Sequence, residues 1–197
     1  TFSYTAATPT VTSLSTTSGP TTGGTAITIT GTGFVTGATV SFGGTAGTGV
    51  TVVSATSITV TSPAVPAGVV DVTVTATGGV SANTVADDFT YYAIPAVTSI
   101  SPVAGVTAGG TTVVITGTAL AGATSVKFGA TTVSFTVDSA TQITTTSPAG
   151  SVGKVDVTVT TPGGTSSTSG TGDDFSYFDV PTVTALSPAK GASAGGT

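Results

Sequence analysis

The sequence predicts an all-β protein made of two copies of one small antiparallel sandwich, and two observations carry that prediction. The chain repeats itself, because Pro9, Pro95 and Pro181 stand 86 residues apart and the Gly-Gly-Thr turns that begin at Gly23 and Gly109 keep the same interval. Its apolar residues also alternate with threonine and serine, as they do in a strand buried on one face. A repeat of this length is one whole small domain.

Each strand of the first repeat is predicted by its own short run of residues. Residues 25–31 and 70–75 alternate most clearly between apolar and polar side chains. The expected strands, in chain order, are residues 10–14, 25–31, 40–42, 50–53, 57–60, 70–75 and 89–92. Residues 18–20 and 23–24 and the pair Gly78-Gly79 are interpreted as turns. No segment has a helical period, and the abundant β-branched Thr and Val favour strands.

The 86-residue period divides the chain into four parts. Residues 1–8, with Phe2, Ser3 and Tyr4, are expected to be the closing strand of a preceding repeat; the two whole repeats are 9–94 and 95–180, and 181–197 opens a further one. About seven short strands per repeat indicate an immunoglobulin-like arrangement. Two explanations of the partial units stay open: a stretch of a longer array, or a loose strand that completes a domain of a neighbouring copy.

The composition excludes several classes of function. Only 6% of the residues are charged, and the formal net charge is −5 with three basic residues. The chain therefore lacks the basic surface that would neutralise phosphates, so no nucleic-acid partner is expected. Without cysteine it has no disulfide and no thiolate nucleophile. No run approaches the ~18 consecutive apolar residues of a membrane span, so none is expected in this segment.

An ordered set of motifs runs through the second repeat. It comprises Pro-x-Val-x-x-Ile-Ser-Pro at 95–102, Gly-Gly-Thr at 109–111, Ile-Thr-Gly at 115–117, Val-Lys-Phe-Gly at 126–129, Thr-Ser-Pro-Ala at 146–149, Val-Asp-Val-Thr-Val at 155–159 and Asp-Asp-Phe-Ser-Tyr at 173–177. This order resembles the IPT/TIG repeat, an immunoglobulin-like domain of the E-set type. The resemblance implies tandem sandwiches similar to those that act as stalks, fibres or spacers in bacterial surface and secreted proteins.

Two acidic pairs are the candidate metal-binding residues. Asp87 and Asp88 stand just before the last strand of the first repeat, and Asp173 and Asp174 stand at the same place in the second. Calcium takes about six to eight oxygen ligands, of which two neighbouring carboxylates could supply several. The simpler interpretation is a solvated turn that caps loop amides; calcium is the alternative, and no other cofactor is expected.

The other acidic residues give no catalytic arrangement. Asp71 and Asp156 lie between inward-facing valines, so each is expected to be an exposed charge on the outer face of its strand, where it discourages contact between sheets. Acid-base catalysis would need a second group and a pocket, to which the sequence does not point. The protein is therefore predicted not to be an enzyme.

The junctions between repeats carry the functional prediction. Tyr92 and Phe178 are expected to face away from the core and to pack against the neighbouring repeat, while Pro95 and Pro181 restrict the backbone. The sequence thus predicts a stiff extracellular rod of a bacterial surface filament or adhesin, whose partners are neighbouring repeats and other copies. The alternative is an adhesive module that binds a glycan or a host protein through loops of the sandwich.

Overall fold

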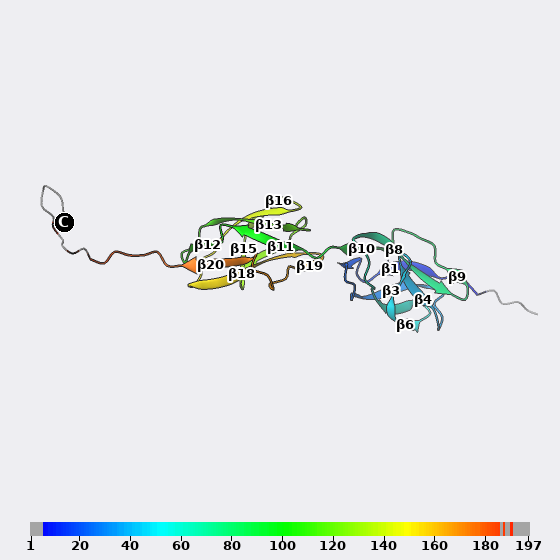
Figure 1. The fold of residues 1–197 in the computed structure, drawn as a ribbon. Coiled ribbons are helices and arrows are strands. Elements are labelled where there is room, and N and C mark those ends of the chain that lie inside the picture. The colour runs from blue at the N-terminus through cyan, green and yellow to red at the C-terminus, as the bar shows by residue number, and fades with distance from the viewer. Residues whose placement is uncertain (1–5, 186, 188–189, 191–197) are drawn as a thin grey trace, which may run out of the picture.

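The computed structural model describes residues 6–185, 187 and 190, and this part of the chain folds as strands without helices. The strands form two β-sandwiches that follow one another along the chain (Figure 1). The predicted all-β class with tandem sandwiches is therefore confirmed. Since the described residues contain no helix, they also contain none that could cross a membrane. The closing strand expected around Phe2, Ser3 and Tyr4 lies outside the described residues.

The first sandwich contains ten strands, three of them only two or three residues long. They are β1 (Thr10–Leu14), β2 (Ser18–Pro20), β3 (Ala26–Thr32), β4 (Thr39–Phe42), β5 (Thr45–Ala46), β6 (Thr48–Ser54), β7 (Ser57–Thr61), β8 (Gly68–Ala76), β9 (Gly79–Val80) and β10 (Asp88–Tyr92).

The second sandwich repeats the same order of strands. They are β11 (Ala96–Ser101), β12 (Ala104–Val106), β13 (Thr112–Thr118), β14 (Ser125–Phe128), β15 (Thr131–Val133), β16 (Phe135–Ser139), β17 (Gln142–Thr146), β18 (Gly153–Thr161), β19 (Gly164–Thr165) and β20 (Asp174–Phe178).

Two sheets face each other in each sandwich. In the first, one sheet has the order β1-β3-β7-β6 and the other β2-β10-β8-β4-β5, with β9 paired to β8. The second sandwich has the equivalent orders β11-β13-β17-β16 and β12-β20-β18-β14-β15, with β19 paired to β18. All pairs are antiparallel except two, β2 with β10 and β12 with β20, which are parallel.

The seven strands predicted for the first repeat are all present, each within two residues of its expected ends. The interpretation of residues 18–20 as a turn is wrong, because they form strand β2 beside β10. The residues involved, Ser18, Gly19 and Pro20, are typical of turns, but an edge strand tolerates Pro and Gly because one side of it needs no ladder bonds. The turn expected at Gly78-Gly79 is present, and its second residue, Gly79, is also the first residue of strand β9.

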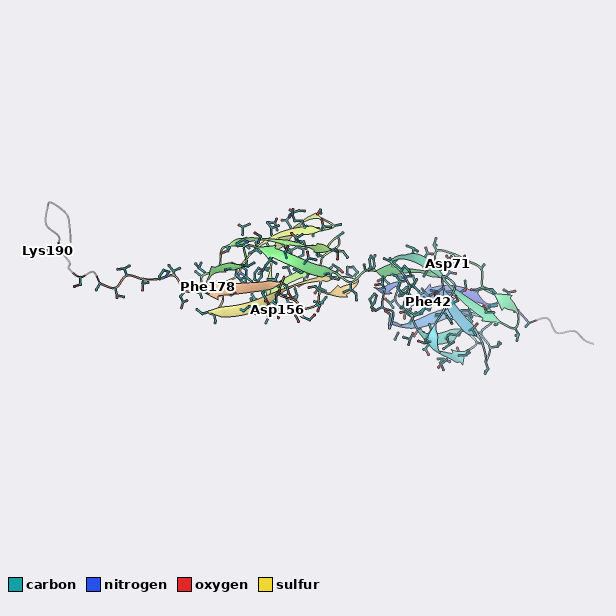
Figure 2. All side chains as sticks on the ribbon, in the orientation of Figure 1. Phe42, Asp71, Asp156, Phe178 and Lys190 are labelled. Carbon is teal, nitrogen blue, oxygen red and sulfur yellow. The ribbon has the colours of Figure 1, made fainter. Side chains whose placement is uncertain are left out.

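Each sandwich has its own hydrophobic core. Phe42 from β4 and the pair Phe89 and Tyr91 from β10 meet edge to face in the first core, with ring centroids 5.0 to 6.4 Å apart. The second core has the same arrangement, in which Phe128 lies 5.2 Å from Phe175. The two sets of core residues have no member in common. Figure 2 shows Phe42 inside the first sandwich.

Candidate functional site

Strand register brings three carboxylates together on the first sandwich. In the antiparallel pair β8 and β10, Asp71 lies directly opposite Asp88. Asp87 immediately precedes β10, and one oxygen from each of these three residues lies within 4.8 Å of the others. Like charges that face each other across a strand pair repel. These three residues are called the acidic cluster below.

Asp87 is the buried member of the acidic cluster, with 0% of its surface exposed. Its Oδ1 accepts a hydrogen bond from the amide of Thr84 at 2.9 Å, whereas its Oδ2 has no partner among the described residues. Burial is the largest cause that raises the pKa of Asp87, and the charges of Asp71 and Asp88 add to it, while the Thr84 amide opposes the shift. Asp87 therefore caps a loop amide, as the simpler interpretation expected, but it is not solvated.

Asp71 is not the exposed charge that the sequence predicts. It is half-buried, and its Oδ2 accepts a hydrogen bond of 2.8 Å from the side-chain amide of Asn83. Its place in the acidic cluster follows from the pairing of β8 with β10. The sequence gives no direct sign of this contact, because Asp71 and Asp88 are far apart along the chain and only the register of two strands joins them.

The second sandwich has the same carboxylates in a different electrostatic setting. Asp156 lies opposite Asp174, and Asp173 is 2% exposed with an Oδ2 that has no hydrogen-bond partner among the described residues. Here, however, Nζ of Lys154 donates to Oδ2 of Asp174 at 2.8 Å. Burial raises the pKa of Asp173, and the charges of Asp156 and Asp174 add to this, whereas Lys154 partly offsets it.

The position equivalent to Lys154 in the first sandwich is Val69. Register places Val69 two residues before Asp71 on β8 and Lys154 two residues before Asp156 on β18. Val69 is 63% exposed and offers no positive charge to the acidic cluster. Figure 2 shows Asp71 on the first sandwich and Asp156 on the second.

The prolines and the aromatic residues predicted for the junctions differ in their exposure to solvent. Pro95 is buried, as is the equivalent Pro9 at the start of the first repeat, whereas Pro181 is exposed. Tyr92 is 40% exposed and Phe178 is 58% exposed. Both aromatic side chains end the last strand of a sandwich on the side away from its core, and their packing against a neighbouring repeat stays a prediction.

Sequence reasoning missed the contact that holds the segment between the repeats. The turn joining β18 to β19 lies against that segment so closely that a Cβ at Gly163 would overlap the carbonyl oxygen of Ala93. The turn joining β8 to β9 repeats this arrangement, and a Cβ at Gly78 would overlap the carbonyl of Ala7. In the first repeat, Thr8 Oγ1 also donates to the carbonyl of Gly78 at 3.1 Å. The sequence predicts Gly78 only as a turn residue and does not single out Gly163.

A shallow depression of about 400 Å³ lies at one end of the second sandwich. It is lined by residues 128–131 and 148–155 together with Tyr177. Its one charged side chain is Lys154, so this depression does not bring two carboxylates face to face. The expectation of a non-catalytic protein stays a prediction.

Comparison with models of known protein families gives a match. The sequence model of the IPT/TIG domain matches residues 9–91 and 95–177. No curated protein sequence matches the chain at a significant level.

Similar solved structures belong to much larger proteins. The full extracellular region of plexin A4 is 22% identical, with a TM-score of 0.46 over 89% of this chain and 18% of that one. SGBP-B from a complex xyloglucan utilization locus in Bacteroides uniformis is 24% identical, with a TM-score of 0.36 over 80% and 47%. Invasin, a bacterial integrin-binding protein, is 18% identical, with a TM-score of 0.38 over 89% and 41%. The chain spans less than half the length of each.

Proposed function

The chain belongs to the IPT/TIG domain family, and from this premise we propose that it is a non-catalytic, load-bearing spacer of the bacterial cell surface or of an extracellular filament. Its tandem sandwiches keep the parts of the larger assembly that they join at a set distance. The partners of such a spacer are neighbouring repeats and other copies of the chain. Few charges, a surface rich in hydroxyls and the tandem repetition support this role.

The parallel strand pair in each sandwich is the observation that carries the proposal. β2, close to the start of the first repeat, runs parallel to β10, which is its last strand. β12 and β20 repeat this arrangement in the second. In Figure 1 each sandwich is entered at one end and left at the other. A pull on the two ends of a repeat therefore draws these neighbouring strands in opposite directions along their common axis.

Tension in that direction loads the bonds between the two strands together. Main-chain bonds stand at both ends of the β2–β10 pair: Thr90 donates to Thr17 at 2.8 Å, and Thr21 donates to Tyr92 at 3.0 Å. In the second repeat Ser176 donates to Val103 at 2.9 Å, and Thr107 donates to Phe178 at 3.0 Å. Sliding one strand past the other must break all the hydrogen bonds between them at the same time. Each repeat therefore resists extension more than it would if these bonds broke one by one.

Single-molecule pulling on the two ends of the chain tests the proposal. We expect two separate unfolding events at similar force, since the two repeats have the same strand order. Each event should release roughly 28–31 nm of extended chain, because a repeat is 86 residues long and an extended residue spans about 3.3–3.6 Å.

The control changes the direction of the pull and leaves the fold intact. Val106 and Phe178 are register partners at the same end of β12 and β20, and both are exposed. The chain has no cysteine, so V106C and F178C together supply two unique attachment points. Pulling there opens the bonds one after another, and the unfolding force should fall severalfold. An equal force in both directions, or end-to-end extension without distinct events, would contradict a load-bearing role.

A further inference from the structure

We propose that the acidic cluster of Asp71, Asp87 and Asp88 binds one hard divalent cation, such as Ca²⁺, and that the positive charge of Lys154 opposes such binding in the second repeat. The inference is independent of the proposed spacer function, because it rests on the chemistry of one cluster. It also departs from the sequence prediction, which placed one acidic pair in each repeat and left out Asp71.

The buried oxygen of Asp87 is the observation that points to a ligand. A carboxylate removed from water is costly unless it is paired, hydrogen-bonded or bound to a metal. Oδ2 of Asp87 has no hydrogen-bond partner among the described residues, and the residue is fully buried. It belongs to a set of three carboxylates whose oxygens come within 4.8 Å of one another. A cation bound among them would satisfy this oxygen and remove the repulsion between Asp71 and Asp88.

The donor set suits a hard cation. Calcium and magnesium prefer oxygen ligands, and calcium accepts an irregular shell that includes water. Asp71 and Asp88 are half-buried, so water can complete the shell on the open side. Asn83 donates to Asp71 and so holds one of the ligands in place. With three protein carboxylates and an open side, we expect a dissociation constant on the order of 1 mM or below.

The second repeat supplies the internal comparison. Its carboxylates Asp156, Asp173 and Asp174 occupy equivalent places, but the ammonium group of Lys154 lies 2.8 Å from Asp174. This ammonium group supplies positive charge beside the carboxylates and repels an approaching cation, although it bonds Asp174 and leaves Oδ2 of Asp173 without a partner among the described residues. The equivalent Val69 supplies no such charge. The difference between the two repeats thus predicts one bound cation per chain and not two.

Calorimetric titration of the full chain with CaCl₂, up to about 10 mM in 150 mM NaCl, measures the stoichiometry. We expect one ion per chain, with amide NMR shifts confined to residues around Asp71, Asp87 and Asp88. At 10 mM the unfolding midpoint of the first repeat should rise by at least roughly 6 °C, while that of the second stays constant. A chain that binds no Ca²⁺ in this range, or binds two ions, would overturn the proposal.

Three variants assign the site. Asp71→Asn removes one ligand and should weaken binding at least tenfold, whereas Asp156→Asn, the same change in the second repeat, should leave binding unchanged. Val69→Lys, at an exposed position, copies Lys154 into the first repeat and should abolish binding with the fold intact by circular dichroism. Equal losses in Asp71→Asn and Asp156→Asn, or full binding in Val69→Lys, would contradict the assignment.

Discussion

At the scale of single residues, a tyrosine hydroxyl joins the last strand of each repeat to a loop. Tyr177 is 2% exposed, and its hydroxyl donates to the main-chain oxygen of Pro148 at 2.9 Å. Tyr91 makes the same bond to Pro63 at 3.0 Å. Burial raises the pKa of both phenols above their ordinary value. Each hydroxyl therefore supplies a bond that a phenylalanine of nearly the same shape would lack.

The change Tyr177→Phe tests this bond. The second repeat should lose about 1 kcal/mol of unfolding free energy at pH 7, the usual net value of such a hydrogen bond. The first repeat keeps Tyr91 and serves as an internal control. The measurement is calorimetric or NMR-detected unfolding of the two repeats.

The same variant predicts a change in the alkaline pH profile. Because the folded-state pKa of Tyr177 is raised, the unfolded chain loses this proton first. The stability that the neutral phenol contributes is therefore complete below about pH 10 and is lost as the pH rises through the folded-state pKa. Between about pH 10 and the folded-state pKa, the second repeat of the wild type should lose stability more steeply than that of Tyr177→Phe. Identical profiles would show that the titration of Tyr177 is not coupled to folding.

At the scale of elements, the turn of the β18–β19 hairpin lies against the segment that joins the first repeat to the second. Gly163 is buried and lies directly against the carbonyl of Ala93 in the connecting segment. Gly78 makes the equivalent contact with Ala7, on the segment before the first repeat. We expect a hairpin in such close contact with the incoming segment to restrict the direction in which that segment joins its sandwich.

The change Gly163→Ala should widen the range of angles between the two repeats. Its Cβ would overlap the carbonyl of Ala93, so the hairpin and the segment must move apart. Small-angle scattering and residual dipolar couplings measure the effect. Gly78→Ala is the matched control, since it moves the segment before the first repeat and leaves the junction between the repeats unchanged. Equal angular spread in the two variants would argue against a role for the hairpin in orienting the repeats.

The elements also show what the sequence could predict and what it could not. Alternation places Val72 and Val74 in the core, because one strand contains the whole pattern. Strand β2 is missed because its neighbour β10 is about 70 residues away in the sequence and its residues favour turns. The contacts of Asp71 with Asp88 and of Gly163 with Ala93 are missed for the same reason. Each is decided by strand register or by close approach, which composition and periodicity do not encode.

At the scale of the whole molecule, the two repeats are separate folding units joined by a short segment. The cores have no residue in common, and both contain an isoleucine at the same structural position, Ile58 in β7 and Ile143 in β17, each 0% exposed. A loss of packing in one core should therefore stay in that core.

The pair Ile143→Val and Ile58→Val tests this independence. Each removes one buried methylene group and should cost about 1 kcal/mol in its own repeat. Hydrogen exchange measured residue by residue should show faster exchange in the altered sandwich and unchanged exchange in the other. Transfer of the destabilisation to the other, unaltered sandwich would show that the repeats unfold together.

Separate interiors have a consequence for how such a chain changes over generations. Each unit brings its own core and its own hairpin to receive the incoming segment, so no side chain of a neighbour has to be altered when a unit is inserted or deleted. Duplication or loss of one repeat can thus lengthen or shorten the product by a unit of 86 residues. The length of the array can in this way be inherited as a number of repeats, without any change in the fold.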